Sequence, residues 1–398
     1  METNRLLDFA RKDLNDLLKW WMTHTPDEIN GGFYGVVRGD NTPNGAADRF
    51  IVVNARLVWT FSAAYHLTKN AKYKKYADRA YDYLTRFFYD EKHGGFYTYV
   101  DYKGTAVNDR KMTYGNAFAV YGLSEYARIF SCDAAKKLAL ETANHLDTHM
   151  WDAQYKGYFE VASRDWQYMP NILMIQYEPE SQKTMNTHLH ILEAYANLLR
   201  IDGDNKLLRH RVRTLLYLFL NKIINNDNWH FNYFQKRDWT LTNPNYSLGH
   251  DIEGSWLLYE AAEILSEPEA LADTKRVCAN MARAVYDMGI SPEGGIYTEY
   301  DVHERSYSDQ FSWWEQNEGV VGFLHAYETT GERKFLDASL ASLDFIEKYF
   351  IDRKHGGWYA YINRDLTPDT ARDKCNPYIC PYHNARMSME IIRRLEKC

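Results

Sequence analysis

The sequence predicts an all-α fold in which six helical hairpins close into a ring, an (α/α)6 toroid with short β-hairpin connectors. Three observations predict it. A short glycine-aromatic element recurs along the chain, the segments between its copies carry paired helical patterns, and the first and last helices have no partner except each other. A fixed period over the whole chain indicates one repetitive domain over residues 1–398 instead of two or three independent ones.

The glycine-aromatic element recurs six times at a nearly constant interval. Clear copies read Gly31-Gly32-Phe33-Tyr34 and Gly94-Gly95-Phe96-Tyr97, and a degenerate copy begins at Trp229. The aligned positions are 32, 95, 157, 230, 295 and 357, so the intervals are 63, 62, 73, 65 and 62 residues. Residues around these copies alternate between apolar and polar, which predicts small strands or hairpins that connect one helical pair to the next.

Apolar residues at helical spacing predict twelve helices. The expected ranges are 4–22, 54–69, 71–89, 113–130, 133–150, 184–201, 205–224, 250–266, 268–288, 313–329, 332–350 and 383–397. An open solenoid of stacked pairs is the structural alternative. Closure is favoured because the first and last helices are needed to complete one pair.

Composition and charge exclude several classes of protein. Hydrophobic residues make up 45% and charged residues 25% of the 398, which is typical of a globular chain. The net charge is −7 and no basic stripe is present, so we expect no nucleic-acid partner. No apolar run is long enough for a membrane helix or typical of a signal peptide, so we expect no membrane partner and a cytoplasmic location. The five cysteines are expected to be free thiols.

In such a ring, the N-terminal ends of the inner helices face a common cavity. Unusual polar and aromatic residues occupy corresponding places near those ends in successive repeats, and they are Arg56, Tyr114, Asn186, His190, His250, Glu253, Trp314, Glu318 and His383. Each has a structural alternative. His250 and Glu253 could cap a helix, Trp314 could fill a core, and Arg56 could pair with a carboxylate. Their recurrence at one level of the ring favours a functional site.

The residue types in this group indicate carbohydrate chemistry. Spacings typical of zinc ligands, phosphate-binding loops and serine nucleophiles are all missing, so we expect no metal and no cofactor. Aromatic rings can cover the apolar faces of a sugar while carboxylates and arginine bond its hydroxyls. Two imidazoles can serve as base and acid near neutral pH. Proton abstraction beside a carbonyl also needs a cation at the developing oxyanion, and Arg56 suits that role.

Five segments resemble the N-acylglucosamine 2-epimerase superfamily, and within it the cellobiose 2-epimerases. They begin at Asn54, Met185, Gly249, Trp313 and Cys380, and read Asn-Ala-Arg, Met-Asn-Thr-His-Leu-His-Ile-Leu-Glu-Ala, Gly-His-Asp-Ile-Glu-Gly-Ser-Trp, Trp-Trp-Glu-Gln-Asn-Glu and Cys-Pro-Tyr-His-Asn-Ala-Arg. The resemblance implies an (α/α)6 barrel. It also implies a reaction that opens a reducing sugar, removes the C2 proton to give a cis-enediol, and returns a proton to the other face.

The resemblance also implies a role for each residue that matches. His250 and His383 would be the two acid/base residues, and His190 would assist ring opening beside Asn186. Glu253 would orient His250, while Arg56 and Tyr114 would hold the O1/O2 end of the sugar. The remaining matches would shape the sugar subsites, and they are Trp256, Trp314, Glu318 and Trp358.

One aromatic position departs from the resembled pattern. Cellobiose 2-epimerases of this type usually carry Trp five residues before the last catalytic histidine, where this chain has Tyr378. That aromatic packs on sugar, so the smaller ring puts a disaccharide preference in doubt.

The expected substrate is an aldose or a β-1,4-disaccharide, with cellobiose converted to glucosyl-mannose. A D-mannose/D-glucose 2-epimerase and an aldose–ketose isomerase are the alternatives within the superfamily. A glycoside hydrolase that uses Glu253 and Glu318, and a non-catalytic sugar-binding toroid, are the alternatives outside it. We expect a monomer or a homodimer.

Overall fold

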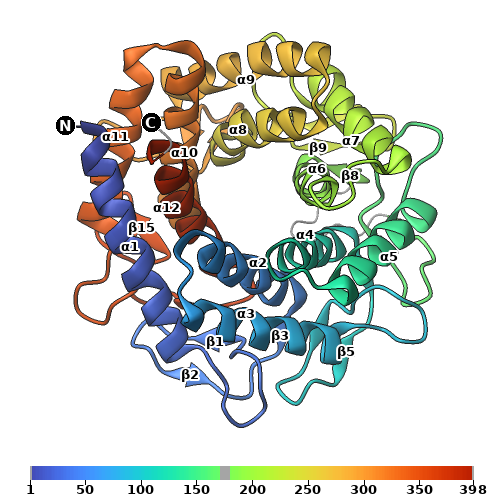
Figure 1. Cartoon of the computed structure of the whole chain (residues 1–398). Coiled ribbons are helices and arrows are strands. Elements are labelled where there is room, and N and C mark those ends of the chain that lie inside the picture. The colour runs from blue at the N-terminus through green and yellow to red at the C-terminus, as the bar shows by residue number, and fades with distance from the viewer. Residues whose placement is uncertain (1, 171–179, 397–398) are drawn as a thin grey trace.

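The structure is a computed structural model that describes residues 2–170 and 180–396, and it forms a closed ring of two concentric helical layers (Figure 1). The inner layer consists of α2 (Ile51–Thr68), α4 (Thr113–Phe130), α6 (Met185–Leu199), α8 (Leu248–Leu265), α10 (Trp313–Thr330) and α12 (Tyr382–Leu395). The outer layer consists of α1 (Glu2–His24), α3 (Ala71–Tyr83), α5 (Asp133–His149), α7 (Lys206–Leu218), α9 (Pro268–Met288) and α11 (Arg333–Phe345). This arrangement confirms the predicted (α/α)6 toroid.

The first and last helices close the ring. The inner helix α12 packs against α10 and α2, and the outer helix α1 packs against α12. An ion pair of 2.8 Å joins Arg11 Nη2 on α1 to Glu396 Oε1, just after α12. Both ends of the chain therefore lie on the same side of the ring (Figure 1), and the open solenoid is excluded.

The observed helices agree with the predicted ranges to within about three residues at most ends. The difference lies at the ends of three outer helices, where α3, α7 and α11 continue as π-helical turns η1 (Leu84–Phe88), η2 (Phe219–Ile223) and η3 (Ile346–Phe350). Hydrophobic periodicity does not distinguish a final π turn from an α turn, because the same apolar residues face inward in both.

Inner and outer helices differ in how they are buried. Almost every residue of α4 and α6 is buried, because these helices contact neighbours on both sides and an outer helix behind. Outer helices bury one stripe only, as α3 does with Tyr73, Ala77 and Ala80. Glycine permits the closest contacts between inner helices: a Cβ on Gly122 would lie 2.5 Å from the carbonyl oxygen of Ala55.

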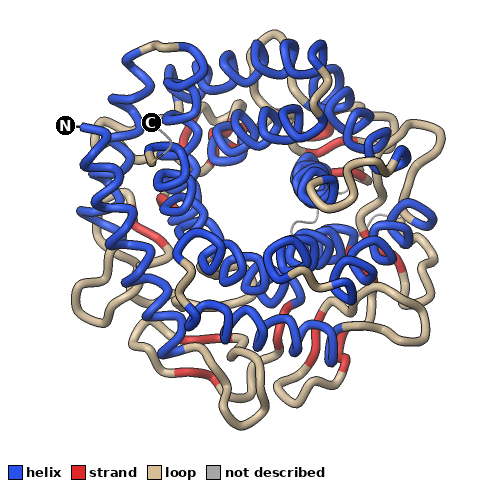
Figure 2. Tube along the Cα trace, viewed as in Figure 1, coloured by secondary structure: helices blue, strands red, loops and turns tan. Residues whose placement is uncertain are grey.

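Short antiparallel strands lie between the helical pairs (Figure 2). They are β1 (Val36–Val37), β2 (Pro43–Asn44), β3 (Arg49–Phe50), β4 (Tyr99–Val100), β5 (Ala106–Asn108), β6 (Lys111–Met112), β7 (Val161–Ala162), β8 (Lys183–Thr184), β9 (Phe234–Gln235), β10 (Leu241–Asn243), β11 (Tyr246–Ser247), β12 (Glu299–Asp301), β13 (Ser306–Tyr307), β14 (Gln310–Ser312) and β15 (Tyr361–Asn363). The strand before an inner helix pairs with the connector of the next repeat, as β3 does with β4 and β11 with β12. Because each such strand runs directly into its helix, this pairing places the first turn of the helix.

A buried ion pair repeats in four of the connectors. An aspartate early in the connector caps its own turn, as Asp90 does by accepting from the backbone N–H groups of Lys92 and His93. The same carboxylate binds a buried cation near the next inner helix, with Lys111 Nζ at 3.0 Å. Equivalent pairs are Asp27–Arg49, Asp152–Lys183 and Asp352–Lys374. These pairs tie each connector to the strand or loop that leads into the following inner helix.

No helix within residues 2–170 and 180–396 is long and apolar enough to cross a membrane. The four cysteines in this part of the chain are free thiols, namely Cys132, Cys278, Cys375 and Cys380. The prediction for Cys398 falls outside the described residues.

Removing one member of a buried connector pair is expected to destabilise the ring strongly. Asp90→Ala leaves the fully buried Lys111 without its carboxylate, and we expect the free energy of unfolding to fall by about 3–5 kcal/mol. Urea denaturation followed by circular dichroism measures this. The control is Asp16→Ala, which breaks the exposed pair with Lys12 and should cost about 0.5 kcal/mol or less. Equal losses in both variants would contradict the assignment.

Candidate active site

The first turns of the inner helices bring the predicted polar residues to one end of the ring. Arg56 comes from α2, Tyr114 from α4, His190 from α6, and His383 from α12, and all four are buried. The other members of the group are Asn186 on α6, His250 and Glu253 on α8, and Trp314 and Glu318 on α10. His250 and Trp314 are the least buried of this group, and both keep part of their surface exposed. The structure thus places side chains from six helices together.

Arg386 lies at the centre of this group, although its role was not predicted. Its Nη1 donates to Glu193 Oε1 at 2.7 Å, and its Nη2 donates to Glu253 Oε1 at 2.5 Å and to Glu318 Oε1 at 2.7 Å. One buried guanidinium on α12 therefore binds carboxylates from α6, α8 and α10. This single side chain connects four inner helices and holds them in register.

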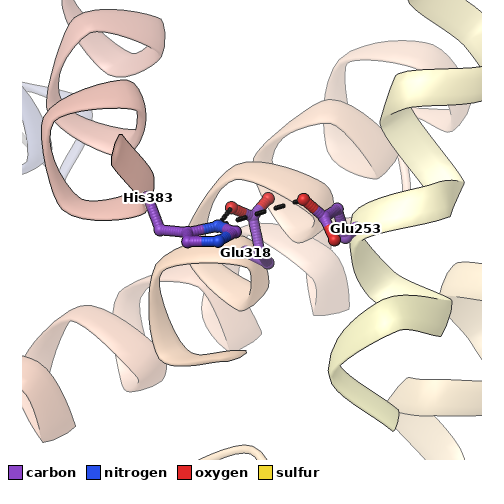
Figure 3. A group of neighbouring side chains, drawn as sticks. All are labelled: Glu253, Glu318 and His383. Carbon is purple, nitrogen blue, oxygen red and sulfur yellow. Dashed lines mark hydrogen bonds and ion pairs between the residues drawn. The ribbon is translucent and has the colours of Figure 1, made fainter. Parts of the chain in front are cut away.

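The imidazole of His383 is oriented by Glu318. Its Nδ1 lies 2.8 Å from Glu318 Oε1 and 3.9 Å from Glu253 Oε1. Figure 3 shows the three side chains beside one another. Trp256 Nε1 donates to the other oxygen of Glu318 at 3.0 Å, which holds that carboxylate in place. Because a carboxylate accepts hydrogen bonds, Nδ1 of neutral His383 carries the proton, and Nε2 keeps its lone pair.

His190 has the same arrangement with a different carboxylate. Its Nδ1 lies 2.9 Å from Glu193 Oε2, and Glu193 Oε1 accepts from Arg386 and from the hydroxyl of Tyr382. Burial alone would raise the pKa of Glu193, but Arg386, His190 and Tyr382 lower this pKa to about 2. Glu193 is therefore charged, and the Nε2 of His190 is the free nitrogen.

His250 has a hydroxyl partner in place of a carboxylate. Its Nδ1 lies 2.6 Å from Ser247 Oγ, the last residue of β11. A hydroxyl can donate or accept, so this contact is compatible with either tautomer of the imidazole. The indole of Trp314 contacts both His250 and His383, with ring centroids 4.6 Å and 5.5 Å apart. The two imidazoles thus flank one aromatic side chain.

Burial disfavours the charged form of these imidazoles. Desolvation lowers the pKa of His383 well below its usual value, and the positive charges of Arg56 and Arg386 lower it further. Desolvation also lowers the pKa of His250, and a proton on His190 or His383 would lower it more. Burial raises the pKa of Glu253, and the neighbouring Glu318 raises it again.

Arg56 has no carboxylate partner within the described part of the chain. Its Nη2 donates to the hydroxyl of Tyr114 at 3.1 Å, and its guanidinium lies over the rings of Phe118 and Tyr382 at 4.2 Å and 4.7 Å. Burial raises the pKa of Tyr114 to about 12, so this phenol stays neutral and can donate. An arginine held by aromatic faces keeps its charge available for an anionic oxygen.

Several buried polar atoms at this site have no hydrogen-bond partner among residues 2–170 and 180–396. They are Asn186 Oδ1, Glu253 Oε2 and the Nε atoms of Arg56 and Arg386. Buried polar groups are rarely left without a hydrogen bond, and those that are can indicate a missing ligand. The unpaired oxygens of Asn186 and Glu253 match the donors of a polyhydroxylated molecule.

Three more predicted binding residues lie outside the group around the histidines or behind it. Trp358 is buried in the connector and donates to Asp13 Oδ1 on the outer helix α1 at 3.0 Å, a contact that helps close the ring, and its place in a sugar subsite stays a prediction. Trp256 is buried below the histidines against Arg386 and Glu318, where it positions a carboxylate. Tyr378 lies on the rim, 48% exposed, with its ring 5.9 Å from that of Phe50.

Sequence reasoning placed Tyr382 and Arg386 at the start of the last inner helix, within the segment that begins at Cys380, but gave neither a role, and it missed Glu193 and Ser247 as site residues. A signal for two of them was present: His190, His250 and His383 each have a charged residue three positions later, namely Glu193, Glu253 and Arg386. Residues i and i+3 share a helix face, so each of these partners faces the same interior as its histidine. Ser247 and Tyr382 carry no comparable signal.

Glu253, Glu318 and His383 form a group whose ligand atoms lie within 4.8 Å of one another, close enough to hold a metal ion (Figure 3). The residues do not fit this role well. Arg386 already binds one oxygen of each glutamate, and its fixed positive charge would repel a divalent cation. The three side chains therefore form an ion-paired cluster.

Metal binding at this cluster is expected to require the loss of Arg386. We expect Mn²⁺ or Zn²⁺ to leave the melting temperature of the wild-type protein unchanged, and Arg386→Met to create a stabilising response to the ions. Differential scanning fluorimetry with and without a chelator measures both. Stoichiometric binding to the wild type that His383→Ala abolishes would contradict the argument.

Comparisons with known proteins identify the family of this chain. The family model of N-acylglucosamine 2-epimerase (GlcNAc 2-epimerase) matches residues 32–384. The chain is similar to the cellobiose 2-epimerase of Bacteroides fragilis, at 36% identity over 94% of this chain and 95% of the relative. It is also similar to the cellobiose 2-epimerase of Ruminococcus albus, at 31% identity over 98% and 99% of the two chains.

A solved structure supports the same relationship. The cellobiose 2-epimerase of Bacillus thermoamylovorans superposes with a TM-score of 0.94 at 33% identity, and the match covers 98% of this chain and all of that one. From the match to the family model and the similarity of these relatives over nearly their full length, we conclude that this chain belongs to the N-acylglucosamine 2-epimerase family.

Proposed function

We propose that this enzyme of the isomerase class is a sugar 2-epimerase that inverts C2 of a reducing sugar by proton transfer between His383 and His250, with cellobiose as the first candidate substrate and glucosyl-mannose as its product. The observation that carries the proposal is the pair of imidazoles, His250 and His383, that both contact Trp314, with the cation of Arg56 acting on both of them. The named activity of the similar proteins supports the choice of substrate.

The reaction begins with an open-chain aldose. We assign ring opening to His190, whose Nε2 is free because Nδ1 is bound to Glu193, with the unpaired oxygen of Asn186 nearby on the same helix. One imidazole then removes the C2 proton. The C2–H bond breaks, its electron pair forms the C1–C2 double bond, and the carbonyl oxygen at C1 becomes an oxyanion.

The oxyanion at C1 is stabilised best by a positive group that is already in position before the negative charge develops. Arg56 and the hydroxyl of Tyr114 are bonded to each other and are held by aromatic rings, so they form a fixed pair of donors. Donors placed in advance at a developing charge are among the largest contributions to enzymatic rate acceleration. In this proposal they stabilise the cis-enediolate formed from either C2 epimer.

The second proton transfer, which delivers a proton to C2, depends on the different hydrogen-bond partners of the two histidines. One imidazole starts the cycle neutral and removes the C2 proton, while the other starts it protonated and gives its proton to the opposite face of C2. The carbonyl at C1 forms again, and the two imidazoles have then exchanged protonation states. Glu318 fixes His383 in the tautomer with a basic Nε2, whereas Ser247 permits both tautomers of His250. A proton on His383 lowers the pKa of His250, so the pair favours holding one proton at a time.

The geometry argues against a glycoside hydrolase that uses Glu253 and Glu318. Glycosidases place two carboxyl groups about 5–10 Å apart with the glycosidic bond between them. Here one nitrogen of Arg386 binds both glutamates at 2.5 Å and 2.7 Å, so a guanidinium occupies the space between them. Hydrolysis would also create reducing ends, whereas epimerisation conserves their number.

Loss of either imidazole is expected to abolish turnover without unfolding the protein. We expect His383→Ala and His250→Ala each to lower kcat by about 10²–10⁴-fold, since each removes a general acid–base group. Incubation of cellobiose in D2O with the wild type should place deuterium at C2 of glucosyl-mannose, read by NMR. His210→Ala, on the exposed face of α7, is the matched control and should keep full activity. Near wild-type turnover in either active-site variant would overturn the assignment.

A monosaccharide such as mannose or glucose is the second candidate substrate, and Tyr378 is the observation that favours it. This residue lies on the rim near Phe50, and its hydroxyl is a neighbour of Tyr99, whose pKa is raised by burial and by this contact. A tyrosine presents a smaller face than the tryptophan of the resembled enzymes to a second sugar ring.

Enlarging this aromatic is expected to favour disaccharides. Tyr378→Trp should raise kcat/KM for cellobiose relative to mannose by about 3–10-fold, because an added aromatic contact contributes about 0.5–1.5 kcal/mol. Chromatography of the products from cellobiose, lactose, mannobiose, glucose, mannose and N-acetylglucosamine gives the ratio. Tyr217→Trp, at an exposed site on α7, is the control. An unchanged ratio would show that Tyr378 does not contact the second sugar.

A further inference from the structure

A second cavity, of about 270 Å³, lies between the C-terminal halves of α2, α4, α6, α8 and α12. We call it the lower pocket, and its walls include Trp59, Tyr121, Arg200, Glu260 and Arg393. Glu260 follows Glu253 by seven residues on α8, so the pocket lies about 10 Å along the ring axis from the catalytic level. The mechanism above uses none of the five residues named here.

A layer of side chains separates the lower pocket from the active site. Glu193, Trp256 and Arg386 line the pocket on one side. On the other side Glu193 bonds to His190, while Trp256 and Arg386 bond to Glu318, which orients His383. All three are buried. The lower pocket therefore lies on the other side of this layer, the shared wall, from the histidines of the candidate active site.

The wall nearest this layer is aromatic. The partly exposed indole of Trp59 stacks on Tyr121, with ring centroids 5.3 Å apart and planes 12° apart, and meets Tyr382 edge-on at 5.2 Å. The indole N–H of Trp59 makes no hydrogen bond to any residue in the described part of the chain, and Trp59 lines the pocket. A rigid aromatic face beside a free donor suits a molecule with both C–H and hydroxyl surfaces.

Ion pairs form the polar part of the wall. Arg128 binds Glu125 at 2.7 Å, Arg200 binds Glu260 at 2.9 Å, and Arg393 binds Glu390 at 2.5 Å. Each cation is matched by an anion, so neither a phosphate nor a cationic ligand finds an unpaired opposite charge there. The arginines are 30–40% exposed and retain free donors, and the carboxylates retain free acceptors, which suits the hydroxyl groups of a neutral ligand.

We propose that the lower pocket is a second, non-catalytic binding site for a neutral sugar of one pyranose ring. The volume lies just below the range of about 300–1,000 Å³ that is typical of drug-sized ligands, so it suits one ring better than two. The lower pocket has no pair of imidazoles like His250 and His383 of the candidate active site, and it binds the sugar without converting it.

The number of bound sugars tests this proposal. The probe is methyl β-D-glucopyranoside, which cannot open its ring and so binds without turnover, and isothermal titration calorimetry counts the sites. Ala63 lines the pocket one turn after Trp59, and Ala63→Trp fills it without touching the shared wall. We expect the number of sites to fall by one in Ala63→Trp and to stay the same in Ala272→Trp, an exposed position on α9.

A second variant covers the case in which Ala63→Trp fails to fold. Arg200→Ala removes a partly exposed donor, and we expect it to weaken the affinity of the same site about tenfold, the effect of losing one hydrogen bond to a charged group. A number of sites that does not fall in folded Ala63→Trp, an affinity unchanged in Arg200→Ala, or no binding to the wild type overturns the proposal. The count does not depend on turnover, so its result is separate from that of the epimerase assay.

Discussion

The arrangement of the site depends on one buried cation, Arg386. Three glutamates from three inner helices converge on its guanidinium, and two of them in turn orient His190 and His383. Burying this many charges is costly unless each is paired, and the pairing here is nearly complete. Arg386 therefore sets both the register of the inner helices and the tautomers of the histidines. Catalytic geometry and ring stability are connected through the same side chain.

The repetitive parts of the fold were predictable, and the reason is physical. Each helical hairpin buries one stripe of its outer helix and all sides of its inner helix. This burial requires an apolar pattern in every repeat, so the period and the twelve helices could be predicted from the sequence. The connectors follow because glycine and an aromatic residue recur where the chain turns. The π-helical ends of α3, α7 and α11 could not be predicted, since they change the backbone without changing which residues are buried.

The grouping of the candidate site residues was predictable where unusual residues stand near helix starts, as at Arg56, His250 and His383. It was not predictable where a residue acts through another one. Arg386 and Glu193 resemble ordinary charged residues of a helix until their distances to the histidines are known. Trp358 shows a structural role that the sequence did not indicate, because its indole N–H bonds to Asp13 on the first helix and helps close the ring.

Closure of the ring by α1 on α12 limits how such a protein can vary. A solenoid gains binding surface by adding repeats, but a ring with one more hairpin would have a wider central opening, and Arg386 could no longer reach all of its carboxylates. The number of repeats is therefore held constant by the reach of one side chain. New substrate preferences must arise in the loops between the helices, while the helical frame stays the same. The loop before α12 is an example, because its Tyr378 departs from the resembled pattern.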